Sequence, residues 1–377
     1  MDDEHMETTR PKRSERRSSA QGATSVDVAA DRATIQDVAK AAGVSNTSVS
    51  NYMNGRLERL GLETRARIAD AVGRLGFKPN QAARQLKTGK TKGIALVVPS
   101  IVNPFNGQLV FAIEQAAVKA GYAVHLCNTM RDNAVEKRFL ENLVGLGVSD
   151  LITIAPLSAR KGFYGPQSDF SVVAIDADRS DLRLPRLDTI NFNHEVAIDL
   201  AVEHLYELGH RRIAYVTDPM ITYSRRKRLA GFKAAMANRG LQGDLVVLLD
   251  ADHGARDIAD AEMLEVGRSA APEVLKLRPR PTAVVAFNDM IALGLLASFR
   301  QAGLSVPGDL SLVGIDDVWV SQLSYPALTT VRQPIEAMGA AAVDRIINHL
   351  AGAVGGGSDT LFLPELTVRE TCGEPSS

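Results

Sequence analysis

The stretch TIQDVAKAAGVSNTSVSNYMNG, residues 34–55, predicts two short helices joined by a tight turn. In its first half, apolar residues recur at i, i+3, i+4 and i+7, the spacing that gives a helix one buried face: Ile35, Val38, Ala39 and Ala42. Gly43 follows where a turn needs a residue that tolerates positive φ. Ser45 stands where a hydroxyl can cap the next helix by accepting from its free amides.

The second helix, at about Asn46 to Met53, has an inner face formed by Val49, Tyr52 and Met53. Its outer face carries short polar side chains that can hydrogen-bond base edges: Asn46, Thr47, Ser48, Ser50 and Asn51. The stretch therefore predicts a helix-turn-helix that reads DNA with its second helix. An alanine-rich helical hairpin that packs on another surface is the alternative, because short patterns of this kind often match by chance.

Positive charge is concentrated around this stretch. Residues 33–92 contain 11 Lys and Arg against 4 Asp and Glu, a net of +7, whereas the whole chain carries −1. Residues 1–32 sum to −1 and the remaining 285 residues to −7. A basic module on an acidic body is typical of duplex binding, because Lys and Arg displace counterions from phosphates.

The bulk composition indicates a soluble protein of two or three domains. The chain has 377 residues, of which 45% are hydrophobic and 23% charged. No apolar run approaches the roughly 20 residues of a membrane span, and the first residues lack the apolar core of a secretory signal. Two cysteines, Cys127 and Cys372, are too few for a disulfide framework. We therefore expect a cytoplasmic protein with no membrane partner.

From Gly93 onward, apolar strand-like runs alternate with helical segments, which predicts an α/β core with parallel sheets. Ligands of such sheets bind at the carboxyl ends of the strands. Polar residues follow several of these runs, including Asp176, Asn288 and Asp316. We therefore expect a polar cleft at that edge, although an Asp that caps the next helix is the alternative for each position.

The predicted domains follow from these patterns. They are a disordered tail at 1–32, an all-α helix-turn-helix headpiece at 33–79, a hinge helix and basic linker at 80–92, a two-lobed core at 93–372 and a short tail at 373–377.

Many segments of the chain, in this order, resemble the LacI/GalR family of bacterial repressors. They are TIQDVAKAAGVS, VSNYMNG, TRARI, FKPNQAARQL, NPF at 103–105, ELGHRRIAYV, RLAGF, NDMIALG, VPGDLSLVGIDD and PALTTVRQP. The resemblance covers about 34 to 370. It implies a headpiece, a hinge helix and a core similar to periplasmic sugar-binding proteins, which forms a homodimer and binds a small effector such as a sugar.

The resemblance also implies which residues contact a pseudo-palindromic DNA operator. These residues are Thr34, Ser45, Asn46, Thr47, Ser50, Asn51, Asn80 and Leu86. Asn51 stands where the family often has Arg, so it should prefer adenine to guanine. Leu86 matches the hinge leucine that wedges between central base pairs, with an ordinary helix-core leucine as the alternative. Gly61 replaces the usual Ser cap of the third helix.

Within the core, the resemblance implies an effector site at Asn103, Phe105, Asp176, Asn193, Arg228, Asn288 and Asp316. For Asp316, a carboxylate that only caps its loop is the alternative. Phe192 stands where the family commonly has Asp, which places the usual hexose contacts in doubt. Residues 250–268 are longer than the matching segment of relatives, so their contacts cannot be transferred.

The sequence thus predicts a DNA-binding repressor under effector control, without a cofactor or metal. A cytoplasmic solute-binding protein that does not read DNA is the second hypothesis. An enzyme is the third, and no phosphate-binding glycine loop, metal-ligand spacing or GxSxG motif supports it. His210 is expected to cap a helix end rather than act as a base.

Overall fold

The computed structural model divides into two compact units, residues 1–87 and 88–377. It describes residues 33–77, 93–145, 147–156, 170–182, 184, 186–219, 222–243, 245–248, 263–350 and 357–376. The predicted tail at 1–32 and the predicted hinge at 80–92, with Asn80 and Leu86, lie outside these residues. The division after residue 87 falls within that predicted hinge.

The first unit contains the predicted pair of helices, α1 (Ile35–Ala42) and α2 (Asn46–Met53). A short 3-10 turn, η1 (Leu57–Arg59), leads to α3 (Leu62–Leu75). Gly43 ends α1 in the left-handed conformation, at φ 64°, as expected for a tight turn. The three helices enclose one apolar core: Val38, Ala39, Ala42, Val49, Leu60, Ile68 and Ala71.

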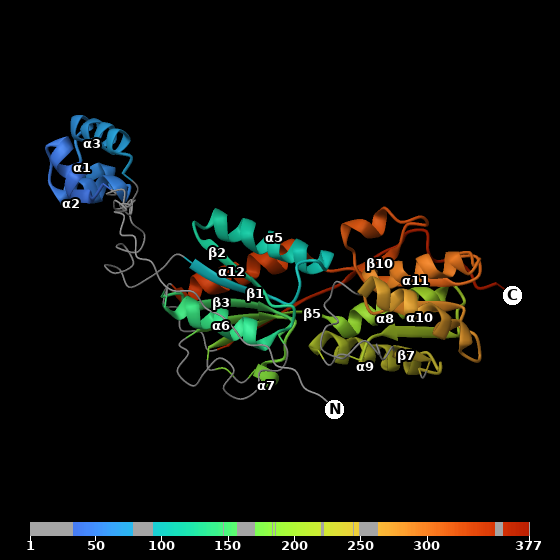
Figure 1. The fold of residues 1–377 in the computed structure, drawn as a ribbon. Coiled ribbons are helices and arrows are strands. Elements are labelled where there is room, and N and C mark those ends of the chain that lie inside the picture. Colours follow the sequence, from blue (N-terminus) through green and yellow to red (C-terminus); the bar gives the residue numbers. More distant parts are fainter. Residues whose placement is uncertain are drawn as a thin grey trace, which may run out of the picture. The chain divides into compact units, whose positions relative to one another are not determined.

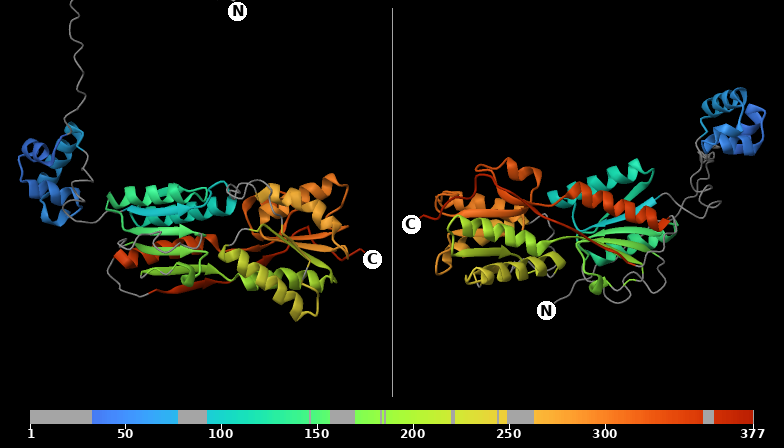
Figure 2. Two further views of the ribbon diagram at one scale, coloured as in Figure 1. Left: turned by 60° about the horizontal axis from the view of Figure 1, so that its bottom comes forward. Right: turned by 180° about the vertical axis from the view of Figure 1, so that it is seen from behind.

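The second unit contains two six-stranded sheets, one in each lobe (Figures 1 and 2). The N-lobe sheet has the order β11 (Asp359–Phe362), β5 (Leu187–Phe192), β4 (Ser171–Ile175), β3 (Asp150–Ile154), β1 (Gly93–Val98) and β2 (Ala123–Asn128). The C-lobe sheet has the order β12 (Glu365–Thr367), β10 (Thr329–Arg332), β9 (Ser311–Asp316), β8 (Ala283–Ala286), β6 (Ile213–Thr217) and β7 (Val246–Leu248). The strand pairs are parallel except β10–β12, which confirms the predicted α/β class.

Helices cover both faces of each sheet (Figure 1). In the N-lobe, α5 (Pro104–Lys119) and α12 (Ile335–Leu350) pack together on one face, and α6 (Asn133–Gly145) packs on the other. In the C-lobe, α8 (His194–Glu207) pairs with α9 (Tyr223–Asn238), and α10 (Met263–Lys276) pairs with α11 (Asp289–Gln301). The short α7 (Arg179–Leu182) and η3 (Trp319–Gln322) follow β4 and β9. None of the described helices is long and apolar enough to cross a membrane.

This covering explains why most strands are apolar without alternation. On β1, Ile94 and Leu96 join the core beneath α5 and α12, whereas Ala95 and Val97 join the core beneath α6. Side chains along β1 therefore alternate between the two cores on opposite faces of the sheet, and both sets are buried. The edge strands are the exceptions, since Leu126 on β2, Leu248 on β7 and Leu361 on β11 are 42%, 55% and 56% exposed.

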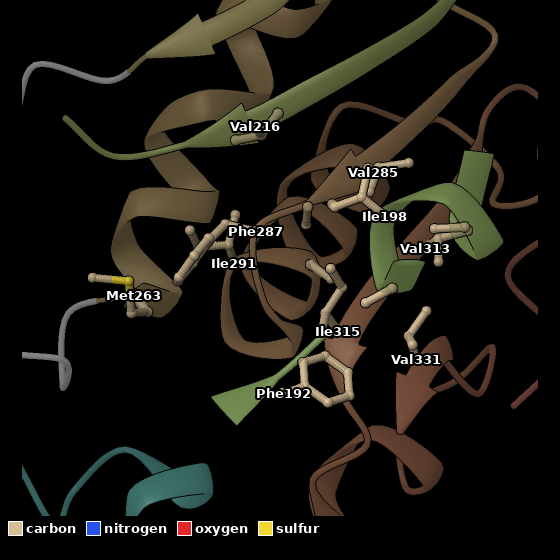
Figure 3. Close-up of a cluster of buried hydrophobic side chains, with 14 of the residues drawn as sticks. Phe192, Ile198, Val216, Met263, Val285, Phe287, Ile291, Val313, Ile315 and Val331 are labelled. Carbon is tan, nitrogen blue, oxygen red and sulfur yellow. The ribbon is translucent and has the colours of Figure 1, made fainter. Parts of the chain in front are cut away.

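The chain crosses between the lobes three times, at residues 192–194, 332–335 and 362–365. The sequence did not predict β5 or β10, which lie at two of these crossings. The apolar segment TLFLPELTV is divided between the lobes, since it forms β11 in the N-lobe sheet and β12 in the C-lobe sheet. Figure 3 shows the C-lobe core next to the first crossing, with Phe192 at the end of β5 directed at Ile315 and Val331.

His210 lies at the end of α8, as predicted, and its amide donates to the Leu205 carbonyl oxygen at 3.0 Å, but its side chain does not cap the helix. Its imidazole is buried and lies 2.9 Å from Thr282 Oγ1 on one side. On the other side it lies 3.0 Å from Ser311 Oγ and 2.9 Å from the carbonyl oxygen of Gly373. The His210 side chain therefore fastens the C-terminal segment to the C-lobe sheet, while only its main chain takes part in the helix end.

Two glycines let α10 and α11 touch through their backbones. A Cβ atom on Gly294 would lie 2.1 Å from the carbonyl oxygen of Leu264, and one on Gly267 would lie 2.1 Å from that of Ile291. No side chain fits at these distances, so the two helices must separate to admit one.

We expect Gly294→Ala to lower the free energy of unfolding by about 3 kcal/mol, because the new methyl group forces α10 away from α11. Chemical denaturation measures the loss. Gly145→Ala, on α6 with no heavy atom within 4 Å of the added Cβ, is the control and should stay within about 1 kcal/mol of the parent protein. Equal stability of the two variants would contradict the close helix contact.

Candidate effector cleft and DNA-facing helix

The first turn of α2 exposes Asn46 and Thr47. Ser50 and Asn51 lie further along the helix and are partly buried. The Ser50 carbonyl oxygen also accepts a hydrogen bond of 2.7 Å from Nδ2 of Asn54. The surface of α2 that is available to a base edge is therefore concentrated at its N-terminal turn, which is the part that enters the major groove in helix-turn-helix proteins.

Thr34 and Ser45 cap the two helices. Thr34 forms a capping box with Asp37, whose carboxylate accepts from both the amide and the hydroxyl of Thr34. Ser45 Oγ accepts from the Ser48 amide at 3.1 Å. Both residues therefore set the start of a helix, and a helix N-terminus is itself a favourable place for a phosphate.

The loop between α2 and α3 is held by Arg65. Its Nε donates to the Leu60 carbonyl oxygen at 2.9 Å, and its Nη2 donates to that of Leu57 at 2.6 Å. Gly61 occupies the cap position of α3 in an extended conformation and supplies no side-chain cap. Arg65, in the first turn of α3, thus stabilises the preceding loop in place of a side-chain cap at position 61.

In the second unit, a cleft lies between the lobes at the carboxyl ends of the strands and contains about 560 Å³, including the solvent at its mouth. In each sheet the first strand of the lobe, β1 or β6, lies between its two successors, so the winding reverses there. Doubly wound sheets bind ligands at such switch points. Six residues predicted to contact an effector line the cleft: Asn103, Phe105, Asp176, Arg228, Asn288 and Asp316.

Asn193, the seventh predicted residue, is not among the lining residues. Its Oδ1 accepts a hydrogen bond of 3.1 Å from the Val196 amide and caps α8. The structure therefore assigns Asn193 to the helix start rather than to the cleft. Asn is a preferred N-cap residue, because its side-chain oxygen accepts from the free amides of the first turn.

The guanidinium of Arg228 is the central charged group of the cleft and is 3% exposed. Its Nη2 donates to Asp316 Oδ1 at 3.3 Å, and its Nη1 donates to the Phe287 carbonyl oxygen. Its Nε donates to His194 Nδ1 at 3.2 Å. Three different groups thus hold this one cation.

His194 continues the chain of hydrogen bonds to the other lobe. Because its Nδ1 accepts from Arg228, its proton lies on Nε2, which donates to Asp176 Oδ1 at 2.9 Å. Burial lowers the pKa of His194, although Asp176 opposes that shift. The imidazole is therefore neutral at physiological pH.

Asp176 receives hydrogen bonds on both carboxylate oxygens. His194 donates to one oxygen, and Ser224 Oγ donates to the other at 2.7 Å. Burial alone would raise the pKa of Asp176, but these hydrogen bonds and the charge of Arg228 together hold the pKa below its usual value. Asp176 is therefore an ionised group between the lobes.

Asp316 has a different environment. Its Oδ1 accepts from Gln333 Nε2 at 2.7 Å as well as from Arg228. Burial raises the pKa of Asp316 to about 7; Arg228 opposes the shift, and the nearby carboxyl of Asp289 adds to it. This carboxyl group therefore titrates near neutral pH.

Asp289, not Asp316, holds the loop after β9. Its Oδ2 accepts from the Val318 amide at 3.0 Å and from Ser321 Oγ at 2.6 Å. Its Oδ1 accepts from Thr330 Oγ1. The carboxyl of Asp316 is thus left to Arg228, Gln333 and the cleft, which argues against the interpretation of Asp316 as only a loop cap.

Several lining residues were not predicted from the sequence. They are Asn106, Arg131, His194, Ser224, Arg225 and Gln333. Backbone strain marks four lining positions, because their φ angles are positive without glycine: Arg131 at 59°, Ala155 at 43°, Asp176 at 59° and Asp316 at 129°. Such conformations cluster at functional sites.

We expect Asp316→Asn to change how stability depends on pH. The native carboxyl keeps its proton up to its pKa of about 7, whereas the unfolded chain releases it at its usual pKa of 3.8. Stability from this group therefore falls as pH rises from about 4 to 7 and is constant above. In Asp316→Asn this fall is absent. The free energy of unfolding of the variant should therefore rise relative to that of the parent protein as the pH increases from about 4 to 7. Chemical denaturation at about pH 4.5, 6 and 7.5 measures the difference, and a constant offset would contradict the assignment.

Comparisons with known proteins agree with both units. The profile described as bacterial regulatory proteins, lacI family, matches residues 34–80, and the profile described as a periplasmic binding protein-like domain matches residues 202–372.

Two curated relatives match along most of their length. The transcriptional repressor PurR of Photobacterium profundum is 30% identical, over 90% of this chain and 98% of that one. The ribose operon repressor of Escherichia coli is 32% identical, over 84% of this chain and 93% of that one. The crystal structure of a Lac repressor dimer, bound to operator and an anti-inducer, superposes with a TM-score of 0.77 at 29% identity, over 90% of this chain and 99% of that one. The chain therefore belongs to the lacI family of bacterial regulatory proteins.

Proposed function

We propose that this protein is a homodimeric repressor that binds a pseudo-palindromic operator and changes its DNA affinity when a small polyhydroxy compound enters the cleft. The observation that carries the proposal is that one chain joins a helix-turn-helix unit to a cleft whose buried ions connect two lobes. The solved Lac repressor, a dimer on its operator with a ligand, supports the same arrangement.

For DNA, the dimer would place two α2 helices in major grooves one helical turn apart. Asn46, Thr47 and Asn51 are the proposed base readers. Thr34 and Ser45 lie at helix starts, where amides and hydroxyls suit phosphates, and the Ser50 hydroxyl, further along α2, is a further proposed contact. Asn80 and Leu86 stay predictions from the sequence, with Leu86 as the wedge that kinks the centre of the operator.

For the effector, the cleft combines aromatic surface with polar groups that retain hydrogen-bonding capacity. Asn103 and Asn288 each use Oδ1 to accept a backbone amide, at 3.0 and 2.9 Å, which leaves their NH₂ groups for a ligand. Phe105 and Phe287 line the same space. Donors, acceptors and ring faces together fit a sugar of monosaccharide size, and a relative is named for ribose.

We further propose that the protein is not an enzyme. Ser224, a serine that lines the cleft, donates to Asp176 rather than to His194, so this serine is not activated by the imidazole. Both ring nitrogens of His194 are engaged, by Asp176 and by Arg228. Neither Ser224 nor His194 is therefore arranged as a nucleophile paired with an imidazole base.

Selection from random duplex DNA at fixed moderate salt should enrich a pseudo-palindrome. In Asn51→Arg, the base read at that position should change from adenine to guanine, because the Arg fork matches guanine O6 and N7. Sequencing of the retained DNA measures both results. No enrichment in the absence and in the presence of sugars would favour the solute-binding hypothesis, and an unchanged base would remove Asn51 from the readers.

The effector proposal predicts that a monosaccharide stabilises the protein against heat. D-ribose is the first probe, within a panel of pentoses and hexoses. Arg228→Lys should lose most of the shift, since a lysine cannot reach three acceptors in different directions. Arg226→Lys, at the ion pair with Asp181, is the control and should keep the full increase in thermal stability on addition of the sugar. Equal shifts in both variants would exclude Arg228 as an effector contact.

A further inference from the structure

We propose that His194 positions Arg228 for the effector and is the group through which Arg228 is joined to Asp176 of the N-lobe. The proposal rests on the proposed effector role of Arg228. It makes His194 a positioning residue for ligand binding, although it need not touch the ligand itself.

The geometry around Arg228 shows what His194 contributes. Asp316 and the Phe287 carbonyl hold the two terminal nitrogens, Nη2 and Nη1. His194 holds Nε, at the opposite side of the group, from 3.2 Å. A planar guanidinium that is fixed at Nε and at both ends cannot rotate about its last bonds, so its remaining N–H groups have defined directions.

A neutral imidazole suits this position better than a carboxylate. Two carboxyl groups, Asp176 and Asp316, already act on the Arg228 guanidinium, and the neighbouring Arg225 is paired with Asp218 at 2.7 Å. A third negative charge in this buried place would be costly. The imidazole of His194 accepts from Arg228 without adding charge, and Glu195, next to it in the chain, is paired instead with Lys227 at 2.9 Å.

Neighbouring rings hold the imidazole in this orientation. Phe192 meets it edge-on with centroids 5.4 Å apart, and Tyr223 does so at 5.7 Å. The imidazole is 2% exposed, so neither nitrogen has water as an alternative partner. Its plane, and therefore the direction of Nδ1, is set by packing before any ligand arrives.

His194 also links the lobes. Asp176 follows β4 of the N-lobe, whereas Arg228 lies on α9 of the C-lobe. Between them stands His194, the first residue of α8, within the crossing that follows β5. A change in the angle between the lobes that moves Asp176 therefore acts on Nε2 of His194, and through Nδ1 on the guanidinium.

Two substitutions separate the two hydrogen bonds. In His194→Asn, Oδ1 occupies the place of Nδ1 and can accept from Arg228, but the shorter side chain does not reach Asp176. In His194→Leu, both hydrogen bonds are lost at similar volume. His210→Gln is the matched control, because His210 is equally buried but fastens the C-terminal segment away from the cleft.

The first measurement is ¹⁵N NMR of the full-length protein without a sugar. We expect the Nε2–H tautomer for His194, identified by loss of its signal in His194→Asn. We also expect a slowly exchanging Nε–H for Arg228 in the parent, in His194→Asn and in His210→Gln, but not in His194→Leu. An Nδ1–H or doubly protonated ring, or a protected Arg228 Nε–H in His194→Leu, would overturn the proposal.

The second measurement is calorimetric titration with D-ribose. His194→Leu should weaken binding by roughly 10- to 100-fold, the effect of one lost hydrogen bond to a charged group. His194→Asn should stay within about 3-fold, and His210→Gln should lower thermal stability without changing the affinity. Equal losses in the Asn and Leu variants would overturn the positioning role. If the parent does not bind D-ribose, that part of the proposed function fails, and the NMR result decides the role of His194 alone.

Discussion

Burial of the Arg228 guanidinium between the lobes is the constraint on which the rest of the core depends. A buried cation is tolerated only with partners at hydrogen-bonding distance, and these come from separate elements: Asp316 at the end of β9, His194 at the start of α8 and the Phe287 carbonyl after β8. Asp316 in turn requires Gln333 after β10. The contact between the lobes is therefore formed by polar groups where it borders the cleft. Polar partners can exchange for water when the lobes separate, whereas an apolar seam would resist separation.

The segments where the chain crosses between the lobes also contribute residues to this site. Two of the three crossings, at residues 192–194 and 332–335, contain His194 and Gln333. A rotation of one lobe against the other must change backbone angles in these short segments, because the sheets and their helices are packed bodies. The residues that orient Arg228 and Asp316 are thus the same residues that move when the lobes rotate. In a regulator, this placement couples ligand contacts to lobe angle without a separate transmitting element.

The sequence was informative where the signals are local and silent where they depend on tertiary partners. The helices of the first unit follow from apolar spacing, Gly43 and Ser45, all within one or two turns. The strands β5 and β10 were missed because they carry polar residues, such as Asp188 and Thr330, whose partners His349 and Asp289 are distant in sequence. The pair Asn193 and His194 shows the limit most clearly. Which of two adjacent residues faces the cleft depends on Asp176 and Arg228, 18 and 34 residues away from His194.

Strain at the strand ends indicates how much of the cleft exists before a ligand binds. Ala155, Asp176 and Asp316 hold positive φ angles without being glycine, at a cost of roughly 1–3 kcal/mol each. Only a surrounding structure that leaves no alternative maintains such angles. Here the buried strands β3, β4 and β9 end at or directly before these residues, and the amides of Ala155 and Asp176 donate to the neighbouring strands. The cleft walls are thus preorganised within each lobe. The binding free energy of an effector is then available to select one lobe angle over another, which is what a change in DNA affinity requires.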